Sequence, residues 1–193
     1  MVFYPGPLRQ EKIAIELYNT VYAVRGAVID GLRDEASAAA WIDGLAGRLP
    51  ARRGGSQRGP GIRELVELRG AVREALQAAA DGRRPGSDVL AAINAASARA
   101  PRSPIVRWRS GGDPIGAIDD HGATYASIVV GALAADAVEL LTGPLRADLR
   151  TCGAPGCVLM FLKDHPRREW CSNACGNRAR QARHYQRSRQ NID

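Results

Sequence analysis

Apolar residues recur every three or four positions along much of this chain, the period expected for helices that bury one face in a core. The repeat is clearest over residues 62–80, where leucines, valines and alanines form one broad apolar face. Less regular repeats predict four more helices, over residues 8–33, 35–48, 88–99 and 122–141. Ser37 is the candidate N-cap of the second of these.

The period changes between residues 105 and 118. Ile105, Val106 and Trp108 are interleaved with arginines, and a glycine-rich turn separates them from a second apolar run. This alternation predicts a β-hairpin, so the expected class is mainly α within α+β. Residues 50–61 are rich in glycine, proline and arginine, which predicts a flexible loop.

Nothing in the pattern predicts export or a membrane span. The N-terminus lacks the cationic start and apolar run of a signal peptide. A span needs roughly 18 apolar residues, and the longest apolar region, 123–141, is interrupted by Thr124, Ser127 and Asp136. A cytoplasmic location is therefore expected. In that reducing compartment, clustered cysteines are more often metal ligands than disulfides.

The positive charge lies mostly at the C-terminal end. Residues 1–145 carry 17 Lys and Arg against 16 Asp and Glu, whereas residues 146–193 carry 10 against 4. A neutral body with a basic tail favours a nucleic-acid or acidic partner for the tail. An arginine-rich composition that merely solvates the surface is the alternative.

All four cysteines of the chain lie in this tail, at Cys152, Cys157, Cys171 and Cys175. Two pairs of thiolates can close a tetrahedral zinc site, and one that leaves no open position is structural. One zinc per chain is therefore expected. An iron–sulfur cluster, which uses the same ligands, and disulfides or free thiols remain alternatives. His165 and His184 are near enough in sequence to replace a cysteine, but surface positions are favoured for both.

The spacing of the pairs also predicts local structure. Cys152 and Cys157 flank a tight turn rich in glycine and proline. Cys171 and Cys175 are four residues apart, so both are expected on the first turn of a helix, with Ser172 or Asn173 as its N-cap. A strand pair formed by Val158 to Phe161 and Trp170 is expected between the pairs, which gives a treble-clef-like arrangement.

The predicted last helix is strongly basic. Arg180, Arg183 and Arg187 share one face, and Arg178 and Arg189 lie opposite. A helix fits the major groove, and arginine binds phosphate and guanine edges bidentately. The candidate nucleic-acid contacts are Asn177, Arg178, Arg180, Arg183, Arg187 and Arg189. A helix that only keeps the protein soluble is the alternative.

The sequence Cys175-Gly176-Asn177-Arg178 resembles the signature of the CGNR zinc-finger proteins, whose N-terminal part is the ABATE domain. The similar tail runs from Leu149 to about Arg189. Besides the cysteines it includes six further positions, Arg150, Phe161, Asp164, Arg168, Trp170 and Ser172. The N-terminal likeness rests on Asn19-Thr20, Arg25 and Trp41, and the helix from Leu65 to Leu76 and Asn94 extend it over most of the chain. This chain departs from the family at His165-Pro166, where Ser or Thr is usual, and at Arg180, where Lys is usual.

The resemblance implies a stress-induced transcription regulator, with a helical sensing or dimerising domain over 1–145 and a finger over 146–193. Asn19, Thr20 and Arg25 are candidate ligand-binding residues, since they are polar within an apolar pattern; capping or bridging is the alternative. Double-stranded DNA is the expected partner, with a small-molecule effector as a candidate. A homodimer would suit a palindromic site, although no residue demonstrates one.

Catalysis is not expected, because the chain has only three histidines and no nucleotide-binding or triad motif. The cluster Asp119, Asp120 and His121 could bind a metal, but it is more typical of a helix N-cap. A protein-interaction module and an RNA-binding protein are the competing functions.

Overall fold

The computed structural model describes residues 6–52 and 58–190, and within them the fold is mainly helical, with three small antiparallel sheets of two strands each. The elements in chain order are α1 (Ile13–Tyr18), β1 (Val21–Val24), β2 (Ala27–Asp30), α2 (Glu35–Gly44), α3 (Ile62–Ala80), α4 (Ser87–Ser97), β3 (Ser103–Trp108), β4 (Pro114–Asp119), α5 (Tyr125–Thr142), η1 (Pro144–Asp148), β5 (Leu149–Thr151), β6 (Met160–Leu162) and α6 (Asn173–Gln190). Residues 53–57 of the expected flexible loop and the first five residues lie outside the described residues.

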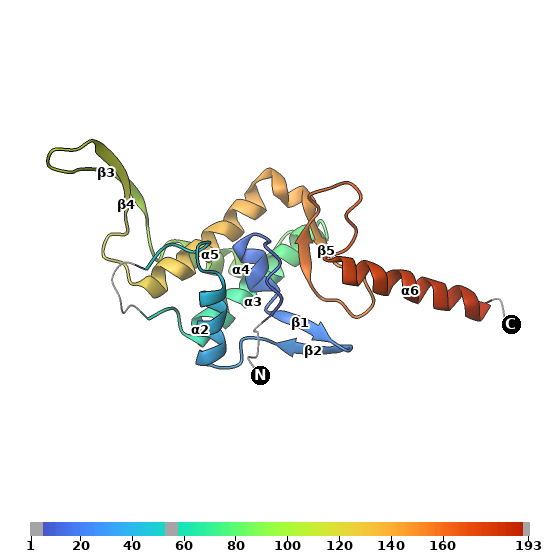
Figure 1. The fold of residues 1–193 in the computed structure, drawn as a ribbon. Helices are drawn as coiled ribbons and strands as arrows, with labels where there is room; N and C mark the ends of the chain where they lie inside the picture. Colours follow the sequence, from blue (N-terminus) through green and yellow to red (C-terminus); the bar gives the residue numbers. More distant parts are fainter. Residues whose placement is uncertain (1–5, 53–57, 191–193) are drawn as a thin grey trace.

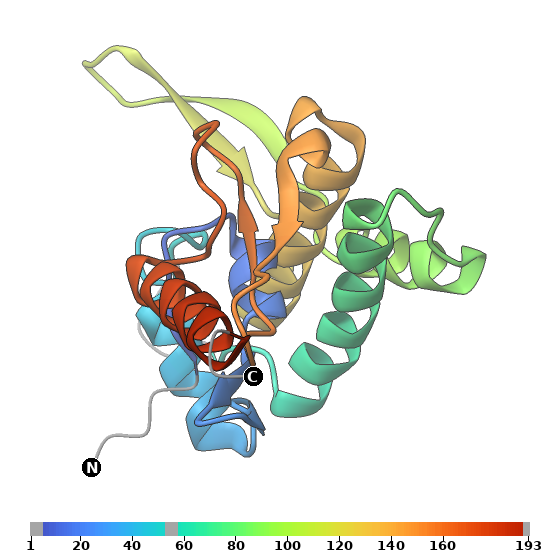
Figure 2. The same cartoon turned by 90° about the vertical axis from the view of Figure 1, so that its right-hand side faces the viewer.

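Helix α5 is the centre of the core, in contact with α1, α3 and α4 (Figures 1 and 2). By length and composition alone it could cross a membrane, with a hydropathy of 1.5. Its buried side chains, from Tyr125 to Leu140, pack against the other helices instead. Leu149 and Met160 of β5 and β6 also belong to this core, so the C-terminal part is anchored in the body.

The predicted helix over 8–33 is wrong in most of its length. Helix α1 has six residues and is followed by the hairpin β1–β2. The hairpin has a two-residue loop, Arg25-Gly26, with φ of 51° and 86°. Positive φ at both loop positions is the geometry of a type I′ turn, which matches the twist of paired strands. The β-branched residues on either side favour strands, and this local preference outweighs the helical spacing.

Two of the expected N-caps are also wrong. Helix α2 ends at Gly44 and is capped by Asp34, whose carboxylate accepts the Ser37 N–H at 2.7 Å; Ser37 completes a capping box. Helix α5 is capped by Thr124, which accepts the Ser127 N–H at 3.2 Å. Of the predicted cap cluster, Asp119 ends β4, and Asp120 and His121 lie between that strand and the cap.

The predicted hairpin over 105–118 is confirmed as β3–β4, paired from Ser103 and Asp119 to Trp108 and Pro114. It projects from one end of the molecule, and α6 projects from the other (Figure 1). In the C-terminal part, β6 pairs with β5, ahead of the first cysteine, rather than with Trp170. This pairing replaces the strand pair expected between the cysteines.

Candidate metal centre and nucleic-acid interface

The four cysteine sulfurs converge on one point. All of them lie within 4.8 Å of one another. The Sγ of Cys157 is 3.8 Å from those of Cys171 and Cys175, and the Cys171–Cys175 separation is 3.4 Å. Zinc–sulfur bonds of about 2.3 Å in a tetrahedron place the sulfurs about 3.8 Å apart. The cluster therefore has the size of a tetrahedral zinc site.

Turns and one helix end hold these ligands in place. The Cys157 N–H donates to the Ala154 carbonyl at 2.9 Å, which closes the turn between the first pair. Ser172 caps α6, as its Oγ accepts the Cys175 N–H at 3.3 Å. Cys171 precedes the helix rather than lying on its first turn, and its N–H donates to the Cys152 sulfur at 3.5 Å.

Without a cation, the thiolate of Cys152 opposes ionisation of Cys157 and Cys171. Hydrogen bonds from Cys157 and Cys171 lower the pKa of the Cys152 thiol to about 2. The hydrogen bond to Cys152 raises the pKa of Cys157 to about 11, and contacts with Cys152 and Cys157 raise the pKa of Cys171 above its ordinary value. One thiolate thus suppresses ionisation of its neighbours. A divalent cation among them supplies the charge that four thiolates require.

An aromatic and aliphatic shell surrounds the metal site. Phe161, Leu159 and Ala179 are buried around the sulfurs, and Trp170 packs against them. A Cβ at Gly176 would lie 2.9 Å from the Trp170 ring, so the signature glycine leaves room for the indole. Arg178 bends back towards the metal site, and its Nη2 donates to the Cys175 sulfur at 3.2 Å.

The six candidate nucleic-acid residues are all exposed on α6, between Asn177 and Arg189. Their environments differ along the helix. The Arg180 guanidinium bonds the Asn177 side chain at 2.5 Å, and Arg183 stacks over Trp170 at 5.6 Å from the ring centroid. Arg187 lies further along, towards the free end of the helix. Ala179 is buried between the two rows of arginines, so α6 makes a small apolar contact with the finger and its arginines flank that contact.

Comparison with family models agrees with this geometry. Residues 149–188 match the CGNR zinc finger, and residues 11–144 match the ABATE family, described as "putative stress-induced transcription regulator". The chain belongs to the ABATE family. Its CGNR finger, with four sulfurs at metal-binding distance, holds one structural zinc. A search of curated proteins finds no match to the chain.

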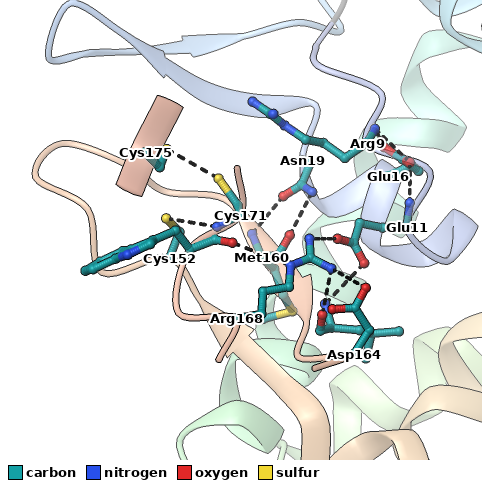
Figure 3. Close-up of polar contacts among 12 residues, drawn as sticks. Arg9, Glu11, Glu16, Asn19, Cys152, Met160, Asp164, Arg168, Cys171 and Cys175 are labelled. Atoms are coloured by element: carbon teal, nitrogen blue, oxygen red, sulfur yellow. Dashed lines mark hydrogen bonds and ion pairs between the residues drawn. The ribbon is translucent and has the colours of Figure 1, made fainter. Parts of the chain in front are cut away.

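Asn19 joins the ABATE region to the CGNR finger. Its side chain donates to the Met160 carbonyl at 3.0 Å and accepts the Met160 N–H at 2.9 Å (Figure 3). Asn19 is almost fully buried, with 2% of its surface exposed. It therefore satisfies both backbone groups of a residue 141 positions away.

A second connection between the two parts was not foreseen from the sequence. Glu11 accepts from the Arg168 guanidinium at 2.7 Å and from the Leu162 N–H at 3.1 Å (Figure 3). Arg168 also pairs with Asp164 at 3.1 Å and lies 4.8 Å from the centroid of the Phe161 ring. No local pattern marks Glu11, because its partners lie about 150 residues further along the chain.

The structure does not bring the three candidate ligand-binding residues together. Asn19 bonds Met160, and Thr20 is buried with its hydroxyl 3.1 Å from the Arg69 guanidinium. Arg25 is exposed in the turn between β1 and β2. Arg69 itself is buried and pairs with Asp30 at 2.5 Å and 2.6 Å. An arginine within the apolar face of α3 is the sequence signal that could have revealed this ion pair.

Proposed function

We propose that this protein is a DNA-binding transcription regulator in which the zinc fixes the direction of α6, and α6 enters the major groove of DNA. The observation that carries the proposal is the position of α6. Its first turn is tied to the metal site, and the rest projects away from the body with exposed arginines (Figure 1). The major groove is about 12 Å wide and admits an α-helix.

Charge supports the same proposal. Among the described residues, Arg183, Arg187 and Arg189 have no carboxylate partner. Their charge is therefore available for phosphate. The ABATE region is close to neutral, so attraction to DNA is concentrated at the finger.

The test is the salt dependence of binding to duplex DNA, measured by fluorescence anisotropy. About four phosphate contacts give a slope near −3.6 for log K against log salt. Replacing Arg187 with Gln should reduce that slope by about 0.9. Arg107→Gln, on the hairpin at the opposite end, is the matched control and should leave the slope unchanged. A slope near zero for the wild-type protein would refute DNA binding.

Competition among duplex DNA, RNA and heparin separates the alternative functions. Preference for duplex DNA supports the proposal, whereas preference for RNA favours an RNA-binding protein. Heparin that competes as well as either nucleic acid indicates that the basic tail binds acidic partners in general, as expected of a module that docks an acidic protein. We assign the zinc no catalytic part, since four thiolates fill its coordination positions.

We also propose that the ABATE region receives the signal and passes it to the finger through Asn19. A small effector or a stress-induced change that displaces the Asn19 side chain would break both hydrogen bonds to Met160. The finger would then lose one of its fixed points on the body. The protein is proposed to act in the cytoplasm, and a homodimer would present two α6 helices to a palindromic site. Light scattering coupled to size exclusion tests the dimer.

A further inference from the structure

A polar groove lies where the N-terminal segment meets the CGNR finger. It has a volume of 870 Å³ and is lined by residues 8–10, by residues 167–173, and by Gly176 and Arg180. Two chain segments more than 150 residues apart therefore form its walls. The groove lies beside the first turn of α6.

The lining of this groove is strongly positive. It includes the guanidinium groups of Arg9, Arg167, Arg168 and Arg180, against one carboxylate, that of Glu169. The charge of Arg168 is already compensated by two carboxylates. Within the described part of the chain, the other three arginines have no ion-pair partner, and Arg180 bonds only the neutral side chain of Asn177.

Arg9 adds a separate observation. Its Nε is buried and has no hydrogen-bond partner, the one such side-chain atom found among residues 6–52 and 58–189. Its backbone N–H is bonded to the Glu16 carboxylate at 3.0 Å, so the main chain is fixed while the Nε atom lacks a partner. A buried polar atom without a partner is costly, although Arg9 as a whole is only half-buried. An anion in the groove would offset that cost.

We propose that this groove binds a phosphate group, with Arg9, Arg167 and Arg180 arranged around its oxygens. Arginine suits this ligand because its planar guanidinium bonds two phosphate oxygens at once. The amino end of α6, at Ser172 and Asn173, adds the partial positive charge of a helix terminus. The inference rests on the proposed function for the source of the phosphate, which is the DNA backbone beside the major groove that α6 occupies.

The site has a structural consequence. Arg9 comes from the segment that precedes α1, whereas Arg167 and Arg180 come from the finger. The groove is complete only while the finger is packed on the body. Phosphate binding therefore favours the state in which the finger is packed on the body. Contacts that hold the finger there, such as that between Asn19 and Met160, favour phosphate binding in turn.

The experiment compares Arg9→Gln and Arg167→Gln with Arg107→Gln, which removes the same charge from the distant hairpin. Each groove variant should reduce the salt slope for duplex DNA by about 0.9, while the control matches the wild type. A second arm titrates each protein with inorganic phosphate alone and follows the emission of Trp170, which lines the groove. Zinc content and melting temperature verify that each variant is folded, and Arg9→Lys should recover part of the lost binding.

The outcomes separate the groove from the proposed function. A smaller salt slope for duplex DNA in the groove variants supports the DNA backbone as the source of the phosphate. An unchanged DNA slope, with phosphate binding lost in Arg9→Gln, supports the groove with a free phosphate-bearing ligand as its source. If the groove variants match Arg107→Gln in both the salt slope and phosphate binding, the groove inference is overturned. The DNA-binding proposal still stands in that case, provided that the wild-type protein has a steep salt slope. A wild-type slope near zero refutes DNA binding, and the phosphate arm then decides the groove alone.

Discussion

Asn19 has a role that its residue type explains well. A carboxamide carries both a donor and an acceptor, so one side chain can satisfy the N–H and the carbonyl of Met160 together. Replacing Asn19 with Ala leaves both groups buried without partners, which should cost about 2–4 kcal/mol of stability. Chemical denaturation measures the loss, and Asn94→Ala, an exposed asparagine on α4, is the control. Equal stability of the two variants would show that Asn19 does not hold the finger.

Arg178 acts on the metal site as well as on the surface of α6. Its hydrogen bond to the Cys175 sulfur offsets negative charge that four thiolates and one zinc leave in excess. In Arg178→Gln we expect zinc release to a chelator to be about tenfold faster, as for other groups that support metal ligands. Arg178→Lys keeps the charge without the planar donor and should fall between. Release as slow as in Arg187→Gln would contradict this role.

The Arg69–Asp30 pair makes the stability of the ABATE region depend on pH. Desolvation raises the pKa of Asp30, but the hydrogen bonds and charge of Arg69 outweigh it and hold that pKa below its ordinary value of 3.8. Because the pKa is lower in the folded state, the charged carboxylate stabilises the fold at pH values above the ordinary pKa of 3.8. The contribution is lost as pH falls through the folded-state pKa.

Denaturation midpoints at several pH values test this pair. Asp30→Asn should be less stable than the wild type at pH 7, and the gap should narrow steadily at pH values below 3.8. Asp113→Asn, in the exposed turn between β3 and β4, controls for loss of a negative charge. A gap that is the same at every pH would mean that the carboxylate charge of Asp30 is not what stabilises the fold.

At the scale of elements, the sequence predicted those whose pattern is local and long. Helix α3 was predicted with its observed ends, because nineteen residues repeat one apolar face. The segment 8–33 failed because its apolar residues fit two periods at once. The Arg25-Gly26 turn decided between them, and a tight turn between valine-rich flanks is a stronger signal than the spacing.

The residues of the candidate site were likewise predicted where their pattern is local and missed where it is not. The four cysteines were found from their spacing, since metal chemistry restricts both residue type and distance along the chain. For Asn19, bridging was only the alternative to ligand binding and its partner was not predicted, and the connection made by Glu11 was not found, because the partners are 141 to 157 residues away. Such contacts depend on how the helices pack, and that information is not local to either residue.

The metal and the strands hold different parts of the finger. Leu149 and Met160 are fully buried in the core of the body, whereas α6 is held through Cys171 and Cys175. In Cys171→Ser we therefore expect loss of zinc and release of α6, with β5 and β6 still in place.

Limited trypsin digestion followed by mass spectrometry tests this division. Cleavage should begin within α6 and the loop before it, and the fragment that ends near Lys163 should persist. Chelation of zinc from the wild-type protein should give the same fragment. Continued protection of α6 without zinc, or rapid digestion of the whole chain, would show that the finger is held in a different way.

The whole molecule has two projections with different chemistry. Hairpin β3–β4 projects at one end and α6 at the other (Figure 1). The hairpin exposes apolar Val106 and Trp108, whereas α6 exposes arginines. Only the α6 end combines a helix of major-groove dimensions with an excess of positive charge. DNA bound there should leave the hairpin end free.

The three tryptophans of the chain can report which end binds. Trp41 is buried in the body, Trp108 is 73% exposed on the hairpin, and Trp170 lies beside α6 under Arg183. Duplex DNA added to the protein should therefore change the emission of Trp170 and leave that of Trp108 unaltered. The change should persist in Trp108→Phe and disappear in Trp170→Phe, with zinc content confirming that the finger remains folded. The reverse pattern would place the nucleic acid on the hairpin, and the arginines of α6 would then need another partner.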